Sequence, residues 1–181
     1  MLDAAGIAYE AIPADLDERA VEAGQAGKSP AEIALALACA KAAALAAAHD
    51  GRLVLGSDSL VSVGGKRFDK PADRAAAVQH LRYFSGKTMH LHSAAAIIRG
   101  DEILWRHAAM ASLKVRHLSD PFIETYLEAE WPAVSGCVGV FRIEAMGVQL
   151  FETIEGDQFT VLGMPLLPLL GALRDLGELP S

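Results

Sequence analysis

The sequence predicts an α/β fold, because segments with the pattern of strands alternate with segments with the pattern of helices along the chain. Alternation of this kind places helices on both faces of a sheet. The chain has 181 residues, of which 52% are hydrophobic and 22% are charged. It is therefore long enough for one globular domain with a hydrophobic core.

Residues typical of helix ends mark the helices. Ser29 and Glu32 form a capping box around a proline at the first helical position, and Gly51 is the expected stop of the alanine-rich helix that follows. A second helix is expected to end at Gly86, and Ser119 is the expected cap of a third. A leucine-rich segment near the C-terminus predicts a last helix.

Short apolar segments predict the strands between these helices. The pair Gly64–Gly65 predicts a hairpin turn, and Gly100–Asp101 predicts a turn between two longer strands. The predicted strands comprise residues 53–58, 89–100, 102–118, 138–143 and 148–154.

The charge of the chain limits its partners. A formal net charge of −7 and a sequence pI of about 5.3 argue against a nucleic-acid partner, although carboxylates with a divalent cation can bind a small phosphate ligand. The apolar stretch 33–48 is mostly alanine and includes Lys41, so no membrane span is expected. The first residues contain no basic region followed by an apolar segment, so no signal peptide is expected. Cys39 and Cys137 fit no CxxC spacing, which indicates reduced thiols in the cytoplasm.

Three charged residues occupy unusual positions. Asp58 ends an apolar strand, where a carboxylate either caps its own hairpin or meets a positive charge in a ligand site. Lys41 shares a helix face with apolar residues at i+4 spacing, so it either snorkels to water or points its ammonium group into a site. Lys70 is either a solvated loop residue or converges with Asp58 on one cavity.

A cluster of carboxylates precedes the first long helix. Asp15, Asp17 and Glu18 are either a solvated acidic turn or ligands of a magnesium ion, which prefers oxygen donors. Together with Asp58 and the two lysines, they suggest a site for a metal and a phosphate group.

The motifs around these residues carry a family resemblance. The segment LVLGSDSLVSVGGKRFDKPADRAAAVQHLRYFSGKTMHLHSAAAII, residues 53–98, resembles the central signature of the Maf family of nucleoside triphosphate pyrophosphatases. In that family a G-[AS]-D strand end, a hairpin, a K-P pair and an S-G-[KR]-T-H-like turn follow in this order. IEGDQFTVLGMPLLPLL, residues 154–170, is similar to the closing segment of the family, and ADLDER and the lysine in ALACAKAAAL match two further positions.

The resemblance implies a fold and a reaction. It implies one domain over residues 1–181, an α/β/α sandwich around a long mixed sheet, similar to the inosine triphosphate pyrophosphatases, and a homodimer. The implied reaction is hydrolysis of a nucleoside triphosphate between the α and β phosphates, which yields a nucleoside monophosphate and pyrophosphate. A divalent cation, magnesium or manganese, is the implied cofactor.

The resemblance also assigns roles to single residues. Asp58 matches the catalytic acid that accepts a proton from water, and Glu18 together with Asp58 matches the metal-binding residues. Lys41 and Lys70 match the phosphate-contacting lysines of the catalytic site.

Two further positions track the nucleobase preference of the family. With Ser59 and Glu144 at these positions, the chain resembles the branch of the family that acts on 7-methyl-GTP. Pyrimidine-preferring members carry glutamine at the position of Glu144.

Two of the departures of the sequence from the family pattern bear on its activity. Family chains usually begin with a strand and an S-x-S-x-R-R loop, which the sequence MLDAAGIAYEAI does not contain. Either the start of the chain was assigned too far downstream, or a naturally shortened member is expected. Gly136 and Cys137 stand where many members carry Asp and Lys. The alternative is therefore a catalytically impaired nucleotide-binding or cell-division regulatory protein.

Overall fold

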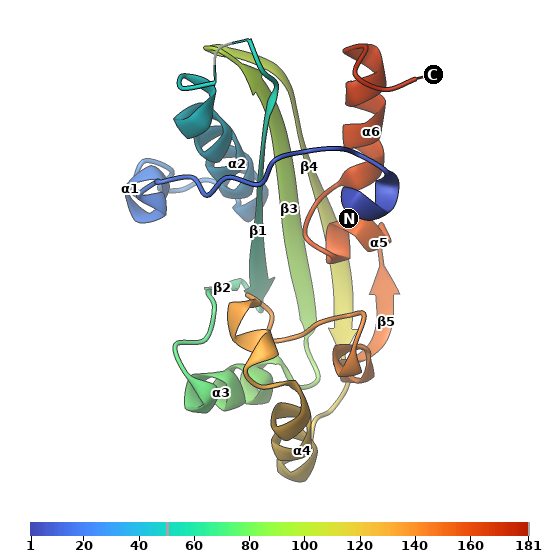
Figure 1. Ribbon diagram of the computed structural model, residues 1–181. Helices are drawn as coiled ribbons and strands as arrows, with labels where there is room; N and C mark the ends of the chain where they lie inside the picture. Colours follow the sequence, from blue (N-terminus) through green and yellow to red (C-terminus); the bar gives the residue numbers. More distant parts are fainter. Residues whose placement is uncertain (50, 181) are drawn as a thin grey trace. The chain divides into compact units, whose positions relative to one another are not determined.

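The structure is a computed structural model that describes residues 1–49 and 51–180 (Figure 1). Its helices are α1 (Glu18–Ala23), α2 (Pro30–Ala46), α3 (Arg74–Phe84), α4 (Asp120–Glu130), α5 (Gln158–Val161) and α6 (Leu166–Asp175), and its short 3-10 helices are η1 (Asp3–Ala5), η2 (Ala133–Gly136) and η3 (Met146–Leu150). Its strands are β1 (Val54–Val63), β2 (Lys66–Phe68), β3 (Thr88–Arg99), β4 (Glu102–Val115) and β5 (Phe151–Glu155).

The five described strands form one sheet in the order β2-β1-β3-β4-β5, in which neighbouring strands run in opposite directions (Figure 1). The α/β class is thus confirmed, and the described sheet is antiparallel where the family resemblance implied a mixed one. Gly64 and Gly65 have φ angles of 58° and 76° and join β1 to β2, as the hairpin prediction required.

The strand that was predicted at 138–143 is wrong, since the structure has turns there. The Tyr126 hydroxyl group of α4 donates a hydrogen bond to the Val140 carbonyl oxygen at 2.9 Å. In a strand, this carbonyl group would instead accept a hydrogen bond from a neighbouring strand. Val140 also has a φ of 56°, outside the strand region. Of the predicted strand 148–154, only the part from Phe151 onward belongs to β5.

The described chain divides into two compact units. Unit 1 consists of Met1–Asp58, Ser93–Ala109 and Gly163–Ser181, and unit 2 consists of Ser59–His92 and Met110–Leu162. The strands β1, β3 and β4 contribute residues to both units. Within the described residues, no helix combines the length and the hydropathy that a membrane span requires.

Unit 2 has a core of large side chains. Phe68 of β2 packs edge-on against Phe84 of α3, with ring centroids 4.8 Å apart, and Tyr126 and Leu127 of α4 are fully buried. These contacts hold α3 and α4 to the strands of unit 2. His80 packs edge-on against Phe68, with ring centroids 5.1 Å apart, and His92 of β3 is buried in unit 2.

We expect these two histidines to destabilise the protein at acidic pH. Burial lowers the pKa of both His80 and His92 from the ordinary 6.5, and the Nδ1 atom of each is buried without a hydrogen-bond partner among the described residues. The unfolded chain therefore binds these protons more readily than the folded chain. The free energy of unfolding should be independent of both groups well above pH 6.5 and should decrease as the pH falls below it.

Urea unfolding at neutral pH and at about one unit below the ordinary histidine pKa measures this effect. The variant His92→Gln lacks one of the two groups, so it should lose less stability between the two pH values than the unaltered protein. Equal losses in the two proteins would contradict the assignment to His92.

Candidate functional site

Gly56 allows helix α2 to lie directly on strand β1. A Cβ atom on Gly56 would stand 2.1 Å from the Ala38 carbonyl oxygen and 2.7 Å from the Ala42 nitrogen. The face of α2 that packs here consists mainly of small side chains at i+4 spacing: Ala34, Ala38, Ala42 and Ala46 are all buried. An isolated glycine inside a strand often marks such a close approach of two backbones, so the sequence did contain a signal for this contact.

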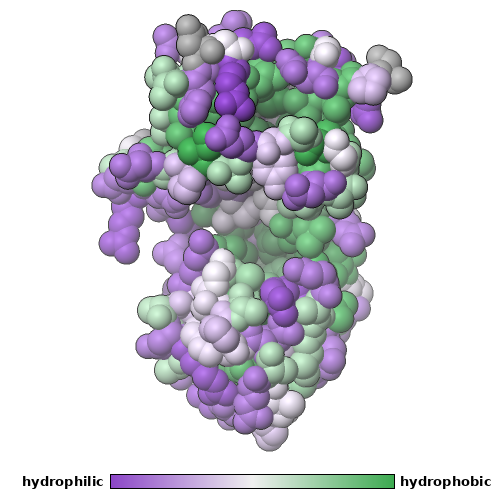
Figure 2. Space-filling view, in the orientation of Figure 1, coloured by the Kyte–Doolittle hydropathy of each residue, from purple (hydrophilic) through white to green (hydrophobic). Residues whose placement is uncertain are grey.

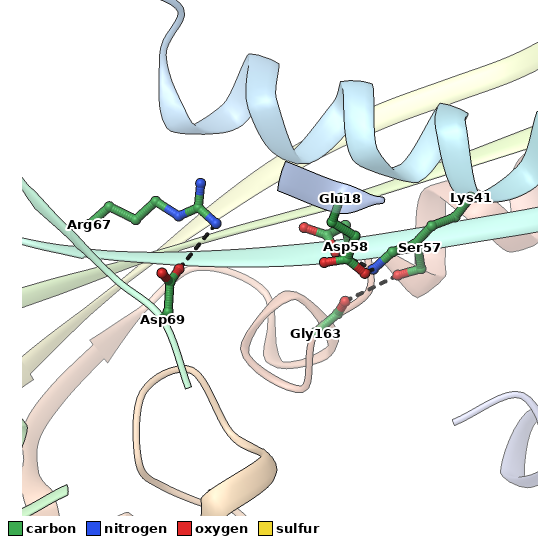
Figure 3. A network of polar contacts seen from close by, with 7 residues as sticks. All are labelled: Glu18, Lys41, Ser57, Asp58, Arg67, Asp69 and Gly163. Carbon is green, nitrogen blue, oxygen red and sulfur yellow. Dashed lines mark hydrogen bonds and ion pairs between the residues drawn. The ribbon is translucent and has the colours of Figure 1, made fainter. Parts of the chain in front are cut away.

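This close approach brings Lys41 of α2 to Asp58 of β1 (Figure 3). Asp58 follows Gly56 by two residues, so both residues face α2. The Lys41 Nζ atom donates a hydrogen bond to Asp58 Oδ1 at 2.6 Å. The Asp58 side chain is only 10% exposed and that of Lys41 is 24% exposed, so this ion pair is largely screened from water.

Glu18 is the third member of the group. It is the first residue of α1, and its Oε1 atom lies 2.9 Å from the same Lys41 Nζ atom (Figure 3). Glu18 is 51% exposed, so it forms the outer side of the group. The neighbouring Asp17 caps α1, because its side chain accepts a hydrogen bond from the Ala20 N–H at 3.1 Å.

Two opposing effects set the pKa of Lys41. Burial acts to lower this pKa, but the hydrogen bonds to Asp58 and Glu18 and their negative charges outweigh burial, so the pKa of Lys41 is raised. The ammonium group is therefore positively charged in the folded protein at neutral pH. Two carboxylates and one ammonium group form a compact site with an excess of negative charge.

Ser57 connects the other face of β1 to the closing motif of the chain. It lies between Gly56 and Asp58, so its side chain points away from α2. Its hydroxyl group donates to the Gly163 carbonyl oxygen at 3.3 Å, just before α6 (Figure 3). In unit 1, α2 and the segment that leads into α6 thus cover opposite faces of β1, as an α/β/α sandwich requires.

Unit 1 also contains a cavity of about 1020 Å³. Ser57 lines it, together with the extended residues 6–13 and the end of α6. Hydrophobic side chains are visible among the hydrophilic ones over unit 1 in Figure 2. The apolar residues of the lining include Leu2, Ile7, Ile12, Val54, Leu55 and Ile97.

The remaining predicted site residues, Lys70, Ser59 and Glu144, belong to unit 2. Lys70 and Glu144 are exposed, whereas Ser59 is half-buried on β1. Burial raises the pKa of the Cys137 thiol, Glu144 raises it further, and Lys70 opposes this rise. Lys70 and Glu144 therefore both lie within electrostatic reach of Cys137, which sequence reasoning did not include in the site. That Lys70 converges with Asp58 stays a prediction.

Glu18 and Asp58 have the donor chemistry for a divalent metal. One cation, the Lys41 ammonium group, already contacts a carboxylate oxygen of each. Among residues 1–49 and 51–180, no three His, Cys, Asp or Glu side chains form a group that could hold a metal ion. Two carboxylates are nevertheless enough for Mg²⁺, which proteins often bind through one or two carboxylates with water and substrate phosphates.

The chain is similar to known proteins along nearly its whole length. The family described as Maf-like protein matches residues 1–176. The chain is 46% identical to the 7-methyl-GTP pyrophosphatase of Rhizobium meliloti (strain 1021) over 183 residues, which cover 100% of this chain and 92% of the relative. It is 47% identical to the protein of the same name from Mesorhizobium japonicum (strain LMG 29417 / CECT 9101 / MAFF 303099), over 99% of this chain and 91% of the relative.

A third relative has a broader name. The chain is 46% identical to the nucleoside triphosphate pyrophosphatase of Rhodopseudomonas palustris (strain ATCC BAA-98 / CGA009), over 94% of this chain and 84% of the relative. The similarity extends over nearly the whole chain in each case. The chain therefore belongs to the Maf family.

Proposed function

We propose that this protein is a nucleotide pyrophosphatase, which hydrolyses a nucleoside triphosphate to a nucleoside monophosphate and pyrophosphate. The observation that carries the proposal is the contact of Lys41 with both Asp58 and Glu18, at 2.6 and 2.9 Å. It joins a largely buried carboxylate, a cation of the kind that binds phosphate and a second carboxylate in one place. The names of the three relatives support the same reaction.

Each residue has a distinct task in the proposed reaction. Asp58 orients the attacking water and accepts its proton, a role in which a side chain must lie within hydrogen-bond reach of the water. Lys41 and Lys70 stabilise the negative charge that develops on the phosphate oxygens in the transition state. Glu18 and Asp58 would hold Mg²⁺ or Mn²⁺. When bound, the metal would polarise the phosphate group and neutralise part of its charge.

The substrate within this class is proposed to be 7-methyl-GTP. Two relatives carry that name, and Ser59 and Glu144 occupy the two positions at which the family resemblance indicates this branch. We further propose that the protein is a homodimer, as the resemblance implies. Cys39 and Cys137 are free thiols, which supports a location in the reducing cytoplasm.

A panel of nucleoside triphosphates with Mg²⁺ or Mn²⁺ tests the proposed function. Chromatography should show the monophosphate and pyrophosphate in equal amounts, with 7-methyl-GTP consumed fastest. Consumption of another nucleotide in preference would contradict the choice of substrate only. No pyrophosphate from any nucleotide would contradict the enzyme proposal and favour a nucleotide-binding protein without catalysis.

A further inference from the structure

The ammonium group of Lys41 contacts both of the carboxylates that are proposed to hold the metal. We propose that Lys41 and the divalent metal compete for these two carboxylates, so that the metal binds well only after Lys41 has moved to the phosphates of the nucleotide. This proposal rests on the proposed function and adds an order to it: nucleotide first displaces the lysine, and the carboxylates then accept the metal. The free protein should therefore bind the metal weakly.

The distances support this competition. The Nζ atom of Lys41 lies 2.6 Å from Asp58 Oδ1 and 2.9 Å from Glu18 Oε1, so the ammonium group bridges the two carboxylates. A bound Mg²⁺ requires its oxygen ligands at about 2.0–2.1 Å. A metal that uses these same oxygens must occupy nearly the same space as the ammonium group, and two cations repel each other at such short range.

The backbone of α2 is held in place, whereas the side chain of Lys41 can change its conformation. The backbone of α2 beside Lys41 lies against β1, because Ala38 and Ala42 contact Gly56 directly. The side chain of Lys41, in contrast, has four rotatable carbons and is 24% exposed. The ammonium group can therefore swing away while the helix stays in place.

A nucleotide offers Lys41 a new partner. Lysine is a compact point charge that binds phosphate readily, and a triphosphate carries more negative charge than the two carboxylates together. When Lys41 turns to the phosphates, the carboxylates lose their cation, and a divalent metal restores the charge balance. Binding of nucleotide and binding of metal are thus coupled, and by linkage each favours the other.

Metal binding to the free protein tests the proposal without any turnover. The variant Lys41→Met removes the competing charge, so the affinity for Mn²⁺, measured by electron paramagnetic resonance without nucleotide, should rise by at least about tenfold. The matched control is Lys28→Met, which removes the same charge just before α2, where Lys28 pairs with the exposed Glu32 at 3.7 Å. This control should bind Mn²⁺ as weakly as the unaltered protein.

A second variant shows that the gained affinity belongs to this site. In the double variant Lys41→Met/Asp58→Asn, one of the two carboxylates is gone, so Mn²⁺ binding should return to the weak level. Lys41→Gln replaces Lys41→Met if circular dichroism shows that the latter is unfolded. Unchanged or weaker Mn²⁺ binding in the folded Lys41 variant would overturn the competition. Because no nucleotide is present, this result is independent of whether the protein releases pyrophosphate.

Discussion

Asp58→Asn should lower the turnover of a nucleoside triphosphate by about two to four orders of magnitude, the contribution that a positioned general base typically makes. Asparagine keeps the shape of the side chain but cannot accept the proton of the attacking water. It also removes one of the two carboxylates proposed to hold the metal. The measurement is the rate of pyrophosphate release at saturating nucleotide and Mg²⁺.

The fold should survive this change. Lys41 keeps an ionic partner, because Glu18 remains 2.9 Å from its Nζ atom. The matched control is Asp101→Asn, which makes the same chemical change at an exposed turn between β3 and β4 of unit 1. Its turnover should equal that of the unaltered protein. If Asp58→Asn also kept full turnover, Asp58 would have no part in the mechanism.

Gly56→Ala should destabilise the protein by about 3 kcal/mol, at the upper end of the usual cost of overpacking. The new methyl group would stand 2.1 Å from the Ala38 carbonyl oxygen, and backbone atoms cannot rotate out of the way as a flexible side chain can. The strand and α2 must therefore separate. Lys41 would then move away from Asp58, so the folded fraction should also lose turnover.

Urea unfolding gives the change in stability, and pyrophosphate release at a temperature where the variant is folded gives the change in turnover. The control is Gly171→Ala in α6 of unit 1, where a Cβ atom meets nothing within 4 Å. Because alanine favours helices, this variant should be as stable as the unaltered protein or slightly more stable. A Gly56→Ala protein with normal stability would show that α2 can move away from β1 at this contact without a loss of stability.

The sequence predicted the local features of the site better than its packing. The capping box of Ser29 and Glu32 begins α2 as expected, because a cap depends only on residues three positions apart. The face of α2 that meets β1 was harder to predict. The i+4 series that contains Lys41 includes the larger apolar residues, but only Leu37 of that series is buried, whereas every alanine of the neighbouring i+4 series from Ala34 to Ala46 is buried.

The physical reason is that hydrophobicity patterns weight large side chains, whereas close contact of two backbones selects small ones. Gly56 and the alanines of α2 form such a contact, which can be recognised only once the helix and the strand are placed together in the fold. For the same reason, a segment of strand-like composition around Val140 could not be recognised as a turn. Its carbonyl group is bound by Tyr126, which lies 14 residues earlier in the chain.

Gly56, Ser57 and Asp58 each meet a different neighbour: a helix backbone, the Gly163 carbonyl group and the Lys41 ammonium group. The side chains of successive residues in a strand point to opposite faces of the sheet, so these three contacts are compatible with only one register of β1. A slip by one residue would place the Ser57 side chain beneath α2 and turn the carboxylate of Asp58 toward the wrong side of the sheet. Insertions or deletions anywhere in Leu55–Ser59 should therefore be far more damaging than substitutions there.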